Sequence, residues 1–409
     1  SVGRKISRFW RTKIMKPQEV NMANIHDTLY RTTQVSFVPF VGTNRKLSGN
    51  VINDYSFNIL GGYALGTQKL EIGSIFNVDR GNVNGIQFAG LFNTVGGRVK
   101  GVQLAGLFNA NGDSLDGTQL AGLINVNLKG SKKFSGAGLI NFTRLDSRAV
   151  QFAGLFNATI GAQRGPQVAG LFNFSTGSVT PLQWAGLWNF SAGNMKGAQV
   201  AGLWNFAGGE VTGGQVSGLL NYATRMKGAQ VGLINISDSI RGVPVGFFSF
   251  SLKGYHKLEI SADEIFYTNV AFRTGVRQFY NIFTAGAKPN TFENDTTFWT
   301  FGYGIGTAPR INKWLSLNFD LTANQLVHRA EIEEINLLNK LHVGCDVRLI
   351  KRVSLTFGVT LNAYITDTTY DGYIDIFTDY RPSIIYDHTY SNNVNMKMWW
   401  GGKVGLRFF

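Results

Sequence analysis

The chain has 409 residues, of which 44% are hydrophobic, 16% are charged and 50 are glycine, and its formal net charge is +14. This mixture is too apolar and too weakly charged for a disordered chain. The glycines also disfavour long helices, because each interior glycine costs a helix about 1 kcal/mol. A single cysteine, Cys345, excludes an intramolecular disulfide and a cysteine-based zinc site.

Residues 1–34 are interpreted as a basic N-terminal extension or linker. Its opening part carries six cations, Arg4, Lys5, Arg8, Arg11, Lys13 and Lys16. No folded basic face or aromatic RNA-binding motif accompanies them, so we expect anionic lipid or an acidic partner and no nucleic acid. The sequence begins at Ser1 and shows no signal peptide, which leads us to expect a processed or truncated N-terminus.

Residues 71–237 carry an internal repeat with a period of 16 residues, which reads Val-x-Gly-x-Gln-x-Ala-Gly-Leu-x-Asn. Its glutamine recurs at Gln87, Gln103, Gln119, Gln151, Gln167, Gln183, Gln199 and Gln215, with Ser135 in the one empty slot. Its asparagine recurs at Asn93, Asn109, Asn125, Asn141, Asn157, Asn173, Asn189, Asn205 and Asn221. Within a repeat these residues lie an even number of positions apart, which is the periodicity of a β-strand.

The two faces of such a strand differ in character. We predict that the polar face lines the lumen of a barrel, with Gln87, Gln103, Gln119, Gln151, Gln167, Gln183, Gln199, Gln215, Asn93, Asn109, Asn125 and Asn157 as its lumen-facing residues. The other face is apolar throughout the array. We predict that it meets lipid or a partner protein through Phe108, Trp184, Trp188, Trp204 and Phe206.

Three architectures fit this alternation. A strand of about twelve residues, at about 3.3 Å each and tilted by about 40°, spans the hydrocarbon layer of a bilayer, which is about 30 Å thick. The four remaining residues suffice for a tight turn, which favours an antiparallel meander in a membrane. A β-solenoid requires a sharp bend at Gly106 and its equivalents, and a soluble sandwich requires a second sheet over the apolar face.

Alternation continues beyond the repeats in different sequences. Residues 353–365 place Val, Leu, Phe and Ile on one side and Ser, Thr, Gly, Asn and Tyr on the other, and residues 315–323 and 341–349 follow the same rule. Counting these segments predicts an all-β fold: one transmembrane antiparallel barrel over residues 35–409, with roughly 20–22 strands, about half of them built from the repeat.

The last segment, residues 396–409, alternates to the end of the chain. We predict that it closes the barrel by pairing with the first strand, with Lys397, Lys403 and Arg407 on the inward face. The residues assigned to this closing strand are Trp400, Leu406, Phe408 and Phe409.

The repeat at Gln103 to Asn109, the entry segment from Val35 to Asn77 and the aromatic end of the chain resemble a Bacteroidota family of outer-membrane surface-repeat proteins. The resemblance covers about residues 35–409. Members of that family often follow a carboxypeptidase-regulatory-like domain, which is a small β-sandwich and not a peptidase. The resemblance implies a bacterial outer-membrane location and carries no activity with it.

Catalytic chemistry finds no support in the sequence. The five histidines are scattered without metal-ligand spacing, and neither a nucleophile elbow nor a phosphate-binding loop is present. We therefore expect no enzyme, no cofactor and no metal. The expected function is that of a scaffold or accessory subunit in a complex for barrel assembly, secretion or nutrient import. Its expected surroundings are outer-membrane lipid or lipopolysaccharide and other outer-membrane proteins. A pore for small solutes and a soluble β-solenoid or adhesion module are the alternatives.

Overall fold

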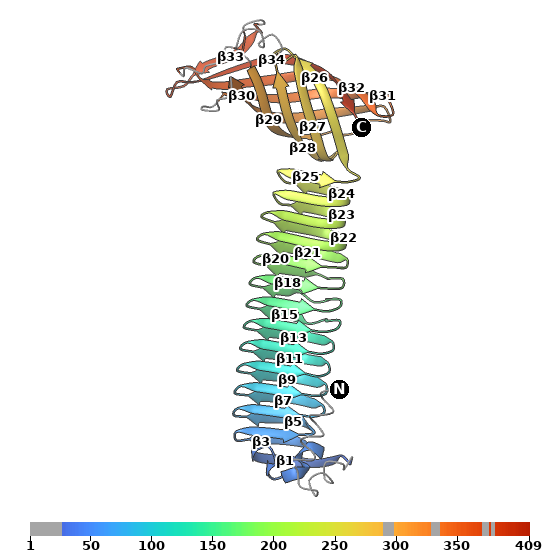
Figure 1. The fold of residues 1–409 in the computed structure, drawn as a ribbon, viewed down its shortest axis with the longest axis vertical. Coiled ribbons are helices and arrows are strands. Elements are labelled where there is room, and N and C mark those ends of the chain that lie inside the picture. The colour runs from blue at the N-terminus through green and yellow to red at the C-terminus, as the bar shows by residue number, and fades with distance from the viewer. Residues whose placement is uncertain (1–26, 289–297, 329–335, 370–375, 378–380) are drawn as a thin grey trace. The chain divides into compact units, whose positions relative to one another are not determined.

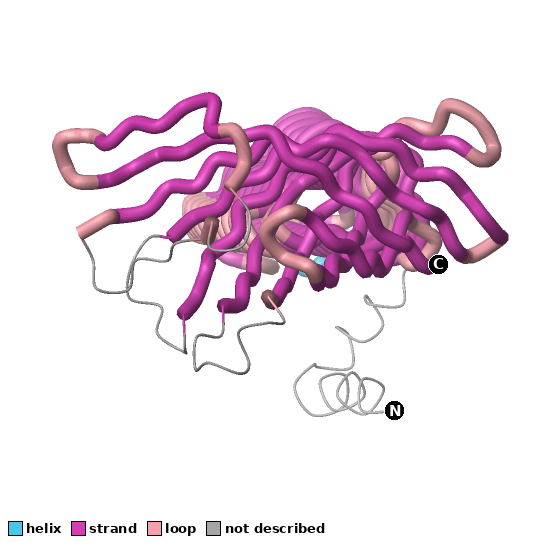
Figure 2. The backbone as a smooth tube through the Cα atoms, turned by 90° about the horizontal axis from the view of Figure 1, so that it is seen from above, coloured by secondary structure: helices cyan, strands magenta, loops and turns pink. Residues whose placement is uncertain are grey.

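The computed structural model describes residues 27–288, 298–328, 336–369, 376–377 and 381–409. It divides into two compact units, residues 1–218 and 219–409. Nearly all of the described backbone is β-strand (Figure 2), and the only helical segment among the described residues is η1, Arg45–Asn50. Most of the predicted N-terminal extension lies outside the described residues. Its last part, from Leu29, is already the first strand.

The first unit is a parallel β-solenoid, in which successive coils are stacked on one another (Figure 1). Its strands are β1 (Leu29–Val38), β2 (Val41–Gly42), β3 (Val51–Asn58), β4 (Gly61–Ala64), β5 (Gly66–Gly73), β6 (Phe76–Asp79), β7 (Val83–Ala89), β8 (Phe92–Val95), β9 (Val99–Ala105), β10 (Phe108–Asn111), β11 (Leu115–Ala121), β12 (Ile124–Asn127), β13 (Ser131–Ala137), β14 (Ile140–Thr143), β15 (Val150–Ala153), β16 (Phe156–Thr159), β17 (Gln167–Ala169), β18 (Phe172–Ser175), β19 (Leu182–Ala185), β20 (Trp188–Ser191), β21 (Met195–Ala201) and β22 (Trp204–Ser217).

Each 16-residue repeat forms one coil and contributes one strand to each of two parallel ladders. Equivalent residues of neighbouring coils lie opposite each other, so Gln103 pairs in register with Gln119, and Asn109 with Asn125. The prediction of an antiparallel meander for the repeat is therefore wrong, and the solenoid alternative is the one observed.

The physical reason for that error is a bend at the centre of each repeat. The chain turns between β9 and β10 at Gly106, so that the alternating run is two strands and not one. A Cβ atom on Gly106 would lie 2.0 Å from the carbonyl oxygen of Gly90 in the preceding coil, a distance that no other residue can tolerate. Glycine at this position lets consecutive coils approach closely while the chain changes direction.

The second unit begins with further coils and continues as an antiparallel barrel. The coil strands are β23 (Leu220–Val231), β24 (Ile234–Val245) and β25 (Phe248–Ser251), which pair in parallel. The later strands are β26 (Tyr255–Asp263), β27 (Thr268–Val276), β28 (Phe279–Ala287), β29 (Phe298–Thr307), β30 (Leu315–His328), β31 (Asn336–Ile350), β32 (Val353–Asp367), β33 (Ile384–Thr389) and β34 (Val394–Phe408).

Eight of these strands close into a barrel. Neighbours pair antiparallel from β26 to β32, then β32 pairs with β34, and β34 pairs with β26. The predicted closing role of the last strand is confirmed, but its partner is β26 and not a strand near residue 35. A barrel of eight strands over residues 255–408 replaces the predicted 20–22 strands over residues 35–409, because the repeats pair among themselves as coils.

The barrel wall also caps the last coil of the same unit. The backbone N–H of Ser249 donates to Asn281 Oδ1 at 2.8 Å, and Asn281 Nδ2 donates to the carbonyl of Gly246 at 2.7 Å. Thr274 Oγ1 donates to the carbonyl of Ser249 at 3.0 Å. An unpaired strand edge invites association with other chains. Here side chains of the barrel form hydrogen bonds with backbone groups of the last coil.

Candidate functional site

The outer wall of the barrel is apolar. In β31 and β32 the outward positions include Leu341, Val343, Phe357 and Val359, each between 41% and 54% exposed. The other strands repeat this pattern with Ile260, Val270, Phe272, Phe301, Ile305, Phe319, Leu321, Trp400, Val404 and Leu406, all exposed. A soluble protein seldom exposes so many large apolar side chains in one continuous wall.

The interior of the barrel is charged and closed to solvent. Arg273 pairs with Glu259 at 2.9 Å and with Asp320 at 2.8 Å, and Arg407 Nε donates to Glu259 at 2.6 Å. Lys403 Nζ lies 3.2 Å from Glu259. Each of these five side chains is at most 12% exposed. Buried charges persist only when they are paired, and these residues supply each other's partners.

Hydrogen bonds between these charged groups and neutral side chains complete the cluster. Arg407 Nη1 donates to Asn318 Oδ1 at 2.6 Å, and the Tyr280 hydroxyl donates to Asp320 Oδ1 at 2.6 Å. Asp346, at 3.7 Å from Arg407, brings the count of acidic groups to three, equal to the three cations. The cluster is thus electrically balanced, and its side chains fill the middle of the barrel.

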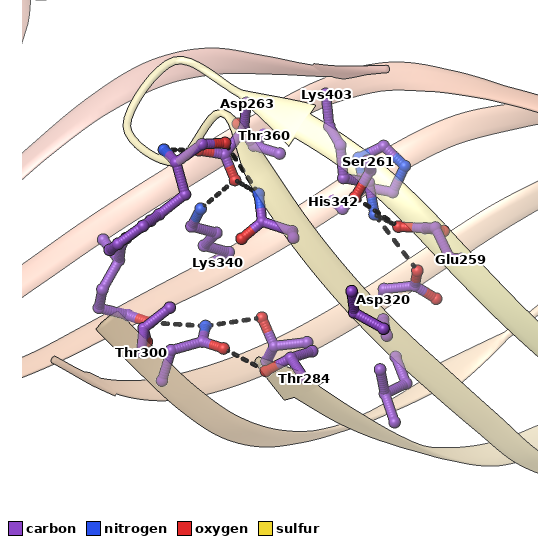
Figure 3. Close-up of a pocket in the computed structure, with 18 of the residues that line it drawn as sticks. Glu259, Ser261, Asp263, Thr284, Thr300, Asp320, Lys340, His342, Thr360 and Lys403 are labelled. Atoms are coloured by element: carbon purple, nitrogen blue, oxygen red, sulfur yellow. Dashed lines mark hydrogen bonds and ion pairs between the residues drawn. The ribbon is translucent and has the colours of Figure 1, made fainter. Parts of the chain in front are cut away.

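A small cavity adjoins the cluster (Figure 3), with a volume of about 60 Å³. Its lining includes His342, Lys403 and Thr360, together with Lys340, which pairs with Asp263. Both ring nitrogens of His342 are buried and have no hydrogen-bond partner among the described residues. A space of this size holds a few water molecules and no solute. Among the described residues there is no group of three or more His, Cys, Asp or Glu side chains that could bind a metal.

The predicted lumen-facing residues lie in the interior of the solenoid coils. Gln103 Nε2 donates to Gln87 Oε1 at 2.8 Å, and Asn93 Nδ2 donates to Asn109 Oδ1 at 2.9 Å. All twelve of them are 0% exposed: Gln87, Gln103, Gln119, Gln151, Gln167, Gln183, Gln199, Gln215, Asn93, Asn109, Asn125 and Asn157. They face inward as the alternation predicted, but into hydrogen-bonded ladders and not into a barrel, because the coils close around them.

Each asparagine also ties the two halves of its neighbouring coils together. Asn109 Nδ2 donates to the carbonyl of Leu120 at 2.8 Å, and Asn157 Nδ2 donates to that of Val168 at 2.8 Å. The same bond recurs 16 residues later in each coil, for example from Asn173 to Trp184. The ladder amides therefore have hydrogen-bond partners inside the coils, which lets the fold bury them at low cost.

One coil replaces the amides by acids. Glu71 occupies the glutamine position and Asp79 lies beside it, and Gln87 Nε2 donates to both carboxylates, at 2.9 Å and 2.7 Å. Burial, with the nearby charge of Glu71, raises the pKa of Asp79 well above its ordinary value. The Asp79 carboxyl group therefore favours its protonated form more than an exposed aspartate does.

The predicted lipid-facing or partner-facing residues lie on the outside of the coils. Trp184 is 57% exposed. The other four stack in ladders: Phe108 on Phe92 with ring centroids 4.9 Å apart, Trp188 on Trp204 at 5.0 Å, and Phe206 on Phe190 at 5.0 Å. Which material covers them stays a prediction.

The closing strand has the predicted faces. Trp400 and Leu406 point outward with 58% and 40% exposure, while Arg407 is fully buried inside the barrel. Phe408 ends β34, and Phe409 lies beyond it. Sequence reasoning placed Lys403 and Arg407 inside but missed the Glu259, Arg273 and Asp320 partners, because pairing between distant strands leaves no local signal. It also missed the capping role of Asn281.

The sequence matches no known protein-family model, and comparisons with curated proteins and with solved structures find no match. Among the described residues, no helix has the length and hydropathy needed to cross a membrane.

Proposed function

We propose that this chain is a non-enzymatic integral protein of the bacterial outer membrane, in which the eight-stranded barrel is a membrane anchor and the solenoid is a scaffold. The observation that carries the proposal is the reversed polarity of the barrel. Its exposed wall is apolar, and its charges lie inside, as the Glu259, Arg273 and Arg407 cluster illustrates. Lipid is the medium that this distribution fits.

Strand length supports the same proposal. The strands β31, β32 and β34 each have 15 residues. At about 3.3 Å per residue and a tilt of about 40°, these three strands reach about 35 Å along the barrel axis, more than the apolar band of about 25 Å that outer-membrane barrels present. The nine-residue strands β26, β27 and β28 reach about 20 Å, so the long strands lie on one side of the barrel. Closed barrels satisfy every strand edge, which is required within hydrocarbon.

The filled interior favours an anchor over a small-solute pore. Buried ion pairs occupy the middle of the barrel, and the adjoining cavity of about 60 Å³ is too small for a solute. Planar-bilayer recordings test this point. The anchor proposal expects silent insertion, and steady conductance of small solutes would contradict it.

A charge on the barrel wall tests the membrane assignment. Val343→Arg places a cation at an outward position in the middle of β31, where such a change costs about 2–4 kcal/mol in lipid. Leu349→Arg, at an exposed position near the end of the same strand, is the matched control. We expect Val343→Arg to lower the fraction inserted into liposomes, measured by protease protection, and Leu349→Arg to change it little. Equal insertion of both variants, or solubility of the wild type without detergent, would refute the proposal.

The scaffold role predicts defined partners. Purification from native membranes in mild detergent, after cross-linking, should yield the chain in a complex of fixed stoichiometry with other outer-membrane proteins. A chain that always migrates alone after cross-linking would contradict the scaffold role and leave the anchor proposal standing.

A further inference from the structure

The outside of the solenoid divides into an apolar half and a charged edge. In the coils between residues 86 and 206 the segment that surrounds the central glycine contains no charged residue, for example residues 102–110, 118–126, 150–158 and 182–190. Its outward side chains are large and apolar. Leu120 and Leu123 are 41% and 40% exposed, Phe152 is 45% exposed and Leu187 is 39% exposed. The apolar surface covers the outer faces of both ladders and the bend between them.

All charges of these coils lie at the opposite edge. Between residues 95 and 213 this edge carries nine lysines and arginines against four acidic residues, an excess of five positive charges. Some are paired within the edge, as Lys129 is with Asp113 at 2.6 Å and Arg164 with Asp146 at 3.7 Å. The remaining excess is positive, which complements anionic phosphate groups.

The apolar bend meets the requirement that hydrocarbon imposes on backbone groups. At the bend of one coil, the N–H groups of Gly122, Leu123 and Ile124 donate to carbonyl oxygens of the preceding coil at 3.2, 2.8 and 3.0 Å. The turn at the charged edge makes similar bonds, such as those from the N–H groups of Gly112 to the carbonyl of Val95 at 2.7 Å and of Leu128 to that of Asn111 at 2.9 Å, so both turns of a coil satisfy their backbone groups. A turn within lipid needs such bonds, because each unsatisfied group costs several kcal/mol there.

The depth of the apolar half is close to the thickness of the acyl region of one monolayer. From position 102 to the glycine at position 106 the chain extends over about four residues, or about 13 Å at about 3.3 Å per residue. This is close to about 15 Å, half of the hydrocarbon thickness of a bilayer, which is about 30 Å. The apolar half of a coil is therefore as deep as the acyl region of one monolayer.

From these observations we infer that the solenoid of residues 70–218 lies along a membrane, with its apolar half inserted among the acyl chains of one monolayer and its charged edge at anionic lipid headgroups. Lipid fits better than a folded partner because the apolar surface wraps around two faces and an edge, and fluid acyl chains can surround all three. The amide ladders, with Asn109 and Gln103 at 0% exposure, satisfy their polar groups without water, and the same coils bury an apolar cluster of Val83, Val95, Val99 and Leu115.

Site-specific labels on the full chain test the inference. Leu171→Cys and Ser178→Cys lie in the same coil, both exposed, at the apolar bend and at the charged edge respectively. Each is combined with Cys345→Ser, carries a nitroxide and is studied in vesicles of phosphatidylcholine and phosphatidylglycerol. The native Cys345, on the barrel wall, reports on the barrel separately. We expect the ratio of relaxation by oxygen to relaxation by a water-soluble nickel complex to be severalfold higher at residue 171 than at residue 178.

The outcomes separate the two proposals. A water-exposed label at residue 171 with a lipid-exposed label at Cys345 overturns the inference and spares the barrel anchor, whereas a water-exposed Cys345 label overturns the anchor. A residue-171 label shielded from both reagents, with spin–spin broadening, means that a second copy covers the surface, and shielding without broadening means another protein does; either overturns the inference. Leu155→Cys, the equivalent exposed position one coil earlier, serves if Leu171→Cys does not fold. If the relaxation ratio is the same in vesicles without phosphatidylglycerol, the proposed contact between the charged edge and anionic headgroups is wrong.

Discussion

The solenoid and the barrel both bury polar side chains, but they satisfy them in opposite ways. In the solenoid, identical neutral amides stack in register, and each donates to the same residue one coil away, as Asn93 does to Asn109. In the barrel, unlike charges from strands far apart in sequence gather in one cluster, where Glu259 contacts Arg273, Lys403 and Arg407. An amide is both donor and acceptor, so it can repeat indefinitely, whereas a charge requires partners of opposite sign. The solenoid should therefore tolerate single losses better than the barrel.

The largest expected loss of stability comes from a substitution that disrupts the charged cluster of the barrel. Arg407→Met leaves Glu259 and Asp320 with one cation fewer inside the barrel, and removal of one partner from a buried ion pair costs about 3–5 kcal/mol. Thermal unfolding in detergent, followed by the heat-dependent shift in electrophoretic mobility, measures the loss. Lys351→Met, at an exposed turn, is the control and should change little. If Arg407→Met were as stable as its control, the cluster would not stabilise the barrel.

The next effect tests the bend that makes a solenoid. Gly106→Ala puts a Cβ atom 2.0 Å from the carbonyl oxygen of Gly90, and relieving that overlap costs about 3 kcal/mol. Gly402→Ala is the matched control, since its nearest contact is an ordinary 3.8 Å. Circular dichroism during thermal unfolding compares the two. Equal melting temperatures would show that the coils can part at the bend without loss.

A smaller loss is expected within the amide ladder. Asn157→Ala removes the donor to Asn173 Oδ1 and to the carbonyl of Val168, which leaves buried acceptors unsatisfied at a cost of about 2 kcal/mol. Thr176→Ala, at an exposed edge position, should have no measurable effect. Denaturant unfolding of the full chain measures the difference. A loss as large as that of Arg407→Met would contradict the contrast between repeated amides and clustered charges.

The smallest expected effect is an increase in stability. Asp79→Asn gives this coil the amide that later coils have at the same position in Asn111 and Asn127, and it removes a buried carboxyl oxygen that has no partner among the described residues, for a gain of about 1 kcal/mol at neutral pH. Because the fold raises the pKa of Asp79, the native state holds this proton more tightly than the unfolded chain does. The stability of the wild type therefore falls as pH rises from the ordinary aspartate pKa through the raised one. The advantage of Asp79→Asn should grow over the same range in unfolding curves, and a pH-independent difference would contradict the raised pKa.

The sequence by itself determined the strand content and the side on which residues lie. Alternation placed Gln103 and Asn109 on the inner face and Trp184 on the outer face. In the final strand it placed Arg407 on the inner face and Trp400 on the outer face. These assignments hold because successive side chains of any strand point to opposite faces, whichever way its neighbours run.

Only the tertiary structure decided how the strands pair. A period of two residues is the same for parallel and antiparallel neighbours, so the choice depended on the close approach of Gly106 to Gly90, which no local pattern reports. The Arg407 partners Glu259 and Asn318 lie 148 and 89 residues away in sequence, and Asn281 caps a coil 32 residues before it. Contacts of this kind arise only when the chain has closed, because their energy depends on distance in space and not on distance along the sequence.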